Sequence, residues 1–345
     1  MNWTRKKLNN LFFIIGVAAV VVMMLTFDVS FVELWEHVTR AGYWLIPIIG
    51  VWIFVYGLNA LAWRCIIKSN KRDDEHVGFW RIYQLTIVGY ALNYATPVGG
   101  LGGEPYRIME LSKHINKESA SSSVILYAMM HFLAHFFLWF SSIFIYLGLV
   151  AIGDLPYSLP VGIILGSIAV FCMVAFYVLG KGYQKGLVVK VVRWVCMIPG
   201  LKRKTRRFLV KNNELLHNID EQIISLHHRD KRAFYSSLVL EYFSRIVQSL
   251  EIFFMLLLFG VDGGGDFAGL AVTFLHSILI LSFTSLFANM IGFLPMQLGV
   301  QEGGFVISIA ALGLSAALGI FVSIICRVRE IIWIVIGLLL MRIEE

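Results

Sequence analysis

The chain consists mainly of long apolar runs separated by short polar segments. A transmembrane helix needs roughly 20 consecutive, mostly apolar residues. The N-terminal run resembles a signal peptide in its charge pattern, but its apolar part is long and no A-x-A cleavage site follows it, so we interpret it as an uncleaved span. Six full spans of an all-α membrane protein are predicted, over residues 11–27, 43–63, 119–152, 159–179, 234–259 and 316–341.

Two further apolar stretches are each interrupted by proline. The stretch from 82 has only 15 residues before Pro97, and the stretch from 268 reaches Pro295. Lys and Arg concentrate on the cytoplasmic side of a membrane. Basic residues flank 82–112 on both sides, whereas 268–312 lies between an acidic loop and an uncharged turn. We therefore predict two re-entrant helical hairpins that enter from opposite sides, with both termini in the cytoplasm and the chain in the inner membrane.

The two hairpins share a short motif. PVGGLGGE at 97–104 and PMQLGVQE at 295–302 both contain a Leu-Gly pair and place Glu seven residues after Pro. Opposed copies of one motif are typical of an inverted structural repeat. A plain glycine packing motif between helices would explain the glycines, but not the two glutamates. The predicted helix breaks lie at Pro97, Gly99, Gly100, Gly102, Gly103, Pro295 and Gly299.

Non-helical backbone at membrane depth is tolerated only where protein or a watery cavity surrounds it. The free N-terminus of a broken helix attracts anions such as phosphate. Charged side chains at this depth cost roughly 2.5–3.5 kcal/mol each, so they are usually paired or functional. They either line a hydrophilic groove or form internal salt bridges. The candidate substrate-binding residues are Glu104, Arg107, His131, Glu241, Arg245, Glu302, Arg327 and Glu330.

Separate roles are expected within that set. Arg107 and Arg327 would meet a phosphate. Glu104 and Glu302 would meet a cationic group, a coupling proton or those arginines. Tyr127, His131, His135 and Trp139 recur every four residues and predict a polar stripe that faces the cavity.

Composition agrees with one polytopic membrane domain over 1–345, because 58% of the residues are hydrophobic and only 15% are charged. The net charge of +7 does not indicate nucleic-acid binding, since most basic residues flank apolar spans. Residues 181–232 hold 13 of them. This segment predicts a basic amphipathic helix on the cytoplasmic membrane surface.

Motifs for catalysis are missing from the sequence. HFLAH lacks the glutamate of the HExxH zinc motif, and GGLGGEP does not match G-x-G-x-x-G. The four cysteines show no CxxC spacing. We expect no metal, no cofactor and no enzymatic activity.

The two Pro–Leu-Gly–Glu motifs, together with Arg107, GLSAA at 313–317 and Arg327, resemble the flippase-like family, also called the lysylphosphatidylglycerol synthase transmembrane region. The resemblance extends over roughly residues 8–342. It implies movement of a lipid headgroup between leaflets, with aminoacylated phosphatidylglycerol, other phospholipids or polyprenol-linked sugars as substrates. Bifunctional relatives carry a soluble aminoacyl-transferase domain, which we expect this chain to lack.

Lipid translocation is therefore the first hypothesis. Its expected partners are membrane phospholipids and a separate lipid-modifying enzyme. The alternatives are an integral-membrane enzyme that uses a glutamate as base on a lipid-linked substrate, and a scaffold whose basic segment binds anionic lipid. The sequence is compatible with a homo-oligomer.

Overall fold

The protein is a bundle of helices. The computed structural model describes residues 12–14, 17–18, 31–70, 76–95, 102–157, 159–185, 189–190, 216–217, 220–221, 224, 230–290 and 299–342. Within these ranges no strand occurs. The all-α prediction is therefore confirmed, as is the prediction of a multi-pass membrane protein, because four described helices are long and apolar enough to cross a bilayer.

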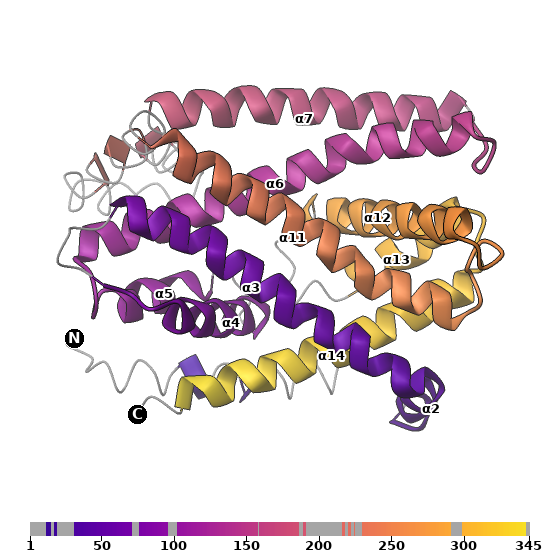
Figure 1. Ribbon diagram of the computed structural model, residues 1–345, viewed down its shortest axis with the longest axis horizontal. Coiled ribbons are helices and arrows are strands. Elements are labelled where there is room, and N and C mark those ends of the chain that lie inside the picture. The colour runs from indigo at the N-terminus through magenta and orange to yellow at the C-terminus, as the bar shows by residue number, and fades with distance from the viewer. Residues whose placement is uncertain are drawn as a thin grey trace, which may run out of the picture.

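Five long helices run along the long axis of the molecule (Figure 1). Each coincides with one of the predicted spans, so the helical prediction for these ranges is confirmed. The predicted first span, 11–27, lies largely outside the described residues. The long helices are α3 (Leu45–Asn70), α6 (Lys117–Ala151), α7 (Leu159–Lys185), α11 (Lys231–Leu258) and α14 (Ala316–Arg342).

The helices differ in how apolar they are. By length and composition alone, the candidate spans are Trp35–Ser69, Lys117–Ala151, Leu159–Gly182 and Phe267–Met290. Helices α11 and α14 are also long, with 28 and 27 residues, but carry buried charged side chains. The helix α12 (Phe267–Met290) has the length of a span, although the sequence assigns it to a hairpin.

Two pairs of helices occupy opposite halves of the bundle. In Figure 1, α4 (Phe79–Ala95) and α5 (Glu104–Leu111) lie in the half in which α14 ends. Helices α12 and α13 (Val300–Ala311) lie in the other half. Residues 96–101 and 291–298 lie outside the described ranges. The predicted breaks at Pro97, Gly99, Gly100 and Pro295 are among them.

The peripheral parts of the bundle have different characters. Helix α7 packs along α6 and exposes Ile163, Phe171 and Val174, as expected of a helix that faces lipid. A short helix, α2 (Phe31–Ala41), and the turn η1 (Gly42–Trp44) precede α3. The predicted amphipathic segment 181–232 lies mostly outside the described residues.

Helix α11 begins with a side-chain cap. Asp230 accepts a hydrogen bond of 2.9 Å from the backbone N–H of Ala233. That bond holds the pKa of Asp230 below its usual value, so the cap is present at neutral pH and weakens as the pH falls through that pKa. We expect Asp230→Ala to lower the free energy of unfolding by about 1 kcal/mol at pH 7, and Asp230→Asn to lower it less. Unfolding in detergent micelles measures both, and equal losses in the two variants would contradict capping.

Candidate functional site

A polar cavity of about 230 Å³ lies inside the bundle. Helices α3, α4, α5, α6, α11, α12, α13 and α14 all contribute to its wall. Aromatic and apolar side chains form part of the lining, among them Trp52, Tyr90 and Phe305. The carboxylate, guanidinium and imidazole side chains that line it are Glu104, Arg107, His131, His135, Arg245, Glu251, Arg329 and Glu330.

Five of the eight predicted site residues line this cavity: Glu104, Arg107, His131, Arg245 and Glu330. The other three contact lining residues directly: Glu241 contacts His131, Arg327 contacts Glu330, and Glu302 contacts Arg327. The predicted residues therefore form one connected region of the structure.

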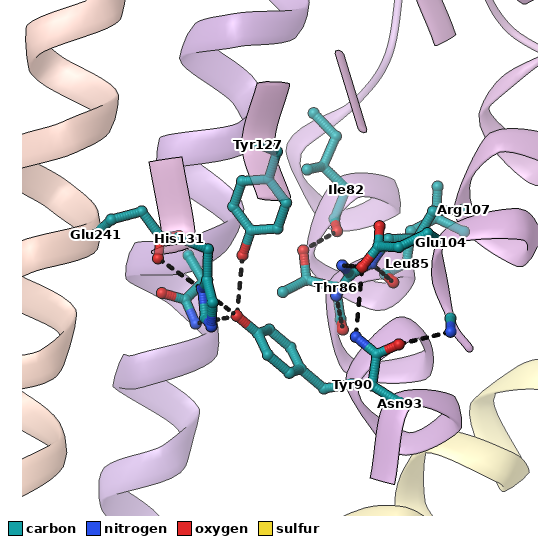
Figure 2. Close-up of polar contacts among 12 residues, drawn as sticks. Ile82, Leu85, Thr86, Tyr90, Asn93, Glu104, Arg107, Tyr127, His131 and Glu241 are labelled. Carbon is teal, nitrogen blue, oxygen red and sulfur yellow. Dashed lines mark hydrogen bonds and ion pairs between the residues drawn. The ribbon is translucent and has the colours of Figure 1, made fainter. Parts of the chain in front are cut away.

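Arg107 lies at the start of α5 and is almost completely buried. Its Nη1 bonds Glu104 Oε1 at 2.9 Å, and its Nη2 donates to the backbone oxygen of Thr86 at 3.2 Å. Its guanidinium carbon also lies over the rings of Trp63, Tyr90 and Tyr127, at 4.9–5.6 Å from their centroids. Cation–π contacts of this kind strengthen when water is excluded. Figure 2 shows Arg107 and Glu104 beside the carbonyl groups of α4.

Asn93 joins the two helices of this half. Its Oδ1 accepts from the backbone N–H of Gly103 at 2.6 Å, and its Nδ2 donates to Glu104 Oε1 at 3.3 Å (Figure 2). The backbones approach closely here, since a Cβ atom on Gly103 would lie 2.0 Å from the carbonyl oxygen of Gly89. The start of α5 is therefore fixed to α4. Asn289 on α12 behaves differently, because it bonds the carbonyl of Ser285 within its own helix.

His131 is the centre of a second polar cluster. Its Nδ1 lies 2.9 Å from Glu241 Oε2 and 2.9 Å from the hydroxyl of Tyr90, which in turn lies 3.2 Å from the hydroxyl of Tyr127 (Figure 2). Arg245 Nη2 lies 2.7 Å from His131 Nε2. The same Nη2 lies 2.6 Å from His131 Nδ1, so the imidazole ring lies between the guanidinium of Arg245 and the carboxylate of Glu241.

The predicted polar stripe on α6 faces this region. Tyr127, His131 and His135 line the cavity, and the indole N–H of Trp139 donates to Ser285 of α12 at 3.0 Å. Four-residue spacing therefore placed these side chains on one face, as expected for a helix.

A third cluster connects α3, α11 and α14. Arg329 Nε donates to Glu251 Oε1 at 2.8 Å, and Trp52 Nε1 donates to Glu251 Oε2 at 2.8 Å. The guanidinium carbon of Arg329 lies 3.9 Å from the centroid of the Trp52 ring. Both members of the ion pair are buried. The sequence shows both charges within apolar runs, but gives no sign that residues so far apart in the chain form a pair.

A fourth cluster connects α13 and α14. Arg327 donates from Nε to Glu302 Oε1 and from Nη1 to Glu330 Oε2, both at 2.8 Å. Gln301 Nε2 donates to Glu330 Oε1 at 3.0 Å. Arg107 and Arg327 were predicted to meet a phosphate, and in this structure each is bonded to glutamate.

Metal binding requires several ligands within reach of one ion. Among the residues that the structure describes, no group of three or more His, Cys, Asp and Glu side chains could hold a metal ion. The lining instead offers ion pairs and hydrogen-bonding side chains around a partly open cavity between the helices. Such a site suits a charged or polar ligand that must be kept out of hydrocarbon.

Comparison with known proteins agrees with this architecture. Residues 13–338 match the family described as the lysylphosphatidylglycerol synthase TM region. The chain is also 21% identical over 329 residues to a UPF0104 membrane protein of Methanothermobacter thermautotrophicus. The alignment covers 91% of this chain and 88% of that protein. No solved structure matches the chain. Since the family match covers nearly the whole sequence, the chain belongs to the lysylphosphatidylglycerol synthase transmembrane-region family.

Proposed function

We propose that this protein moves a lipid headgroup between the two leaflets of the membrane through the polar cavity. The observation that carries the proposal is a partly open cavity inside the helix bundle, lined by arginine, glutamate and histidine together with apolar side chains. A charged headgroup has a high free energy in hydrocarbon, whereas the acyl chains do not. The headgroup would pass through the cavity while the acyl chains remain in lipid. Membership of a lipid-related family supports this function.

We further infer that α4–α5 and α12–α13 are two re-entrant hairpins related as an inverted repeat. Three observations support this: the pairs occupy opposite halves of the bundle, the second helix of each pair is short, and that short helix carries a glutamate in its first turn (Figure 1). Together with six spans and the basic segments that flank them, this topology would have both termini in the cytoplasm, in the inner membrane. Carrier proteins often bind substrate where such repeats meet.

The lining favours a substrate with a phosphate, with or without an amine. Arg107, Arg245 and Arg329 supply positive charge, and Glu104, Glu251 and Glu330 supply negative charge. Each arginine is already bonded to a carboxylate, so a phosphate would replace that carboxylate rather than meet a bare cation. The displaced carboxylate would need a new partner, such as a proton or an amine of the headgroup, because an unpaired buried charge is strongly unfavourable. An anionic or aminoacylated phospholipid satisfies this requirement.

Transport is tested in proteoliposomes. Lipids bound to the purified protein are identified by mass spectrometry, and a fluorescent analogue of each is reconstituted with the protein. Quenching of the label in the outer leaflet then follows translocation. We expect wild-type protein to accelerate translocation over empty vesicles. Glu104→Gln, Glu302→Gln and Arg327→Gln should each slow it at least about tenfold, since a hydrogen bond to a charged group contributes about 1.5–3 kcal/mol.

The matched control is Glu36→Gln, because Glu36 is an exposed residue of α2. It should transport as fast as wild type, and circular dichroism should show that all variants keep their helical content. If wild-type vesicles are no faster than empty ones for anionic, zwitterionic and aminoacylated lipids, translocation is not the function. A chemically altered lipid would instead favour a membrane enzyme.

A further inference from the structure

The buried arginines of the bundle differ in how strongly they are paired. Within the described residues these arginines are Arg107, Arg245, Arg327 and Arg329. Three of them are hydrogen-bonded to a carboxylate at 2.8–2.9 Å. Arg245 is the exception, because its ion pair with Glu241 is 3.5 Å long and includes no hydrogen bond. Its guanidinium group is therefore the one most readily bound by another anion.

The other three guanidinium groups are already occupied. Arg107 is bonded to a glutamate and a backbone carbonyl, and it lies over three aromatic rings. Arg327 is bonded to two glutamates and does not line the cavity. Arg329 donates from Nε and Nη2 to both oxygens of Glu251, and its Nη1 lies 3.8 Å from Glu330. A phosphate could bind these arginines only by breaking charge-assisted hydrogen bonds, which are the strong ones.

The surroundings of Arg245 leave hydrogen-bond donors available. Its Nη1 donates to Gln248 Oε1 at 3.0 Å. Because a guanidinium can only donate, this bond fixes the amide oxygen of Gln248 toward Arg245 and leaves the amide nitrogen as a donor. Neither that nitrogen nor Arg245 Nε has a hydrogen-bond partner in the part of the chain that the structure describes. Both residues line the cavity, three positions apart on α11, so they offer it one positive charge and two unused donor groups.

We propose that Arg245 and Gln248 form the phosphate-binding subsite of the cavity. A guanidinium group matches the geometry of phosphate oxygens and binds them with paired hydrogen bonds, and the amide of Gln248 donates a further one. On the basis of the proposed function, the phosphate is that of the translocated headgroup. The sequence instead assigned this role to Arg107 and Arg327, whose guanidinium groups hold the helices of their own halves together.

The exchange of partners costs least at Arg245. Binding of a phosphate there breaks no hydrogen bond between oppositely charged groups, whereas the same exchange breaks one such bond at Arg107 and two at Arg329. The carboxylate that gives way is Glu241, and its Oε2 lies 2.9 Å from His131 Nδ1. Glu241 therefore keeps a polar partner when the phosphate takes up Arg245.

Binding measurements test the subsite without any transport. Calorimetry compares three probes on the purified protein in neutral detergent: short-chain phosphatidylglycerol, the matching diacylglycerol, which has no phosphate, and inorganic phosphate. We expect phosphatidylglycerol to bind and diacylglycerol not to bind. Arg245→Gln should weaken binding at least about tenfold, because a hydrogen bond to a charged group is lost. Arg245→Lys should restore only part of it, since an ammonium lacks the guanidinium fork. Arg232→Gln, which removes an exposed charge from the same helix, should bind like wild type.

A second variant keeps Arg245 in place. Gln248→Glu has nearly the same shape and puts a carboxylate where the amide oxygen now accepts from Arg245 at 3.0 Å. The new ion pair would occupy the guanidinium group and repel a phosphate, so affinity for phosphatidylglycerol should again fall at least about tenfold. The thermal midpoint of unfolding should stay the same or rise, because no buried charge loses its partner. A loss of binding in this variant could then not be attributed to misfolding.

Inorganic phosphate identifies the source of the bound group. If it binds in a way that depends on Arg245 while phosphatidylglycerol does not, the subsite exists for a free anion and the lipid function fails. If phosphatidylglycerol binds through Arg245 but no lipid crosses the bilayer, the subsite holds and transport alone fails. The proposal is overturned if neither probe binds wild-type protein, or if Arg245→Gln and Gln248→Glu bind phosphatidylglycerol as tightly as wild type.

Discussion

Replacing Glu251 by glutamine is expected to lower the free energy of unfolding by about 3–5 kcal/mol, because it leaves the guanidinium of Arg329 buried beside a neutral side chain. Glu251 accepts from Arg329 and from the indole N–H of Trp52, each at 2.8 Å. Arg329 is only 3% exposed, and its distance to Glu330, the other nearby carboxylate, is 3.8 Å. Reversible unfolding in mixed micelles measures the loss.

Two comparisons separate this electrostatic effect from a packing effect. The double variant Glu251→Leu with Arg329→Met removes both charges and should recover most of the lost stability. The reason is that replacing a buried ion pair by apolar residues of similar volume is often neutral or stabilising. Glu36→Gln, which removes an exposed carboxylate, should change stability by no more than about 0.5 kcal/mol. A double variant no more stable than Glu251→Gln would show that the pair itself is not the cause.

The long helices of this protein are largely predictable from the sequence, because the longer apolar runs have the length that a bilayer requires. The predicted ranges 159–179 and 316–341 coincide with α7 and α14, apart from their ends. Ends differ because polar residues continue a helix beyond the apolar run. Helix α6, for example, begins at Lys117, where Asn116 caps it by accepting from the N–H of Ser119.

Within the candidate site, the sequence predicts contacts that are local in the chain. Pairs at i,i+3 share a helix face, so Glu104 with Arg107 and Arg327 with Glu330 could be anticipated, and both occur at 2.8–2.9 Å. The rule says which charges are near each other, but not which additional groups surround them.

Contacts between distant segments could not be predicted in this way. Glu251 and Arg329 are 78 residues apart, and Trp52 and Glu251 are 199 apart. Single residues of this kind have no spacing signature, since their proximity depends on how whole helices pack. The aromatic surroundings of Arg107 are an example: Trp63, Tyr90 and Tyr127 come from three different helices.

Replacing Gly103 by alanine is expected to destabilise the α4–α5 pair by about 1–3 kcal/mol or more, because it forces two backbones apart. A Cβ atom at this position would lie 2.0 Å from the carbonyl oxygen of Gly89, and backbone cannot move aside as a flexible side chain can. The backbone angles of Gly103, φ −82° and ψ −17°, suit alanine, so the effect would come from the collision alone. The shift would also lengthen the 2.6 Å bond from Gly103 to Asn93.

The α12–α13 pair supplies a matched control. A Cβ atom on Gly303 of α13 would meet no atom within 4 Å, so Gly303→Ala should leave stability unchanged or raise it by about 0.5–1 kcal/mol, as alanine does within a helix. Unfolding midpoints and headgroup translocation are then compared between the two variants. Loss of both in Gly103→Ala, with both retained in Gly303→Ala, would show that close α4–α5 packing holds Glu104 and Arg107 in place. A Gly103→Ala protein as stable and active as wild type would mean that these helices separate without consequence, and that Arg107 is held by its aromatic neighbours instead.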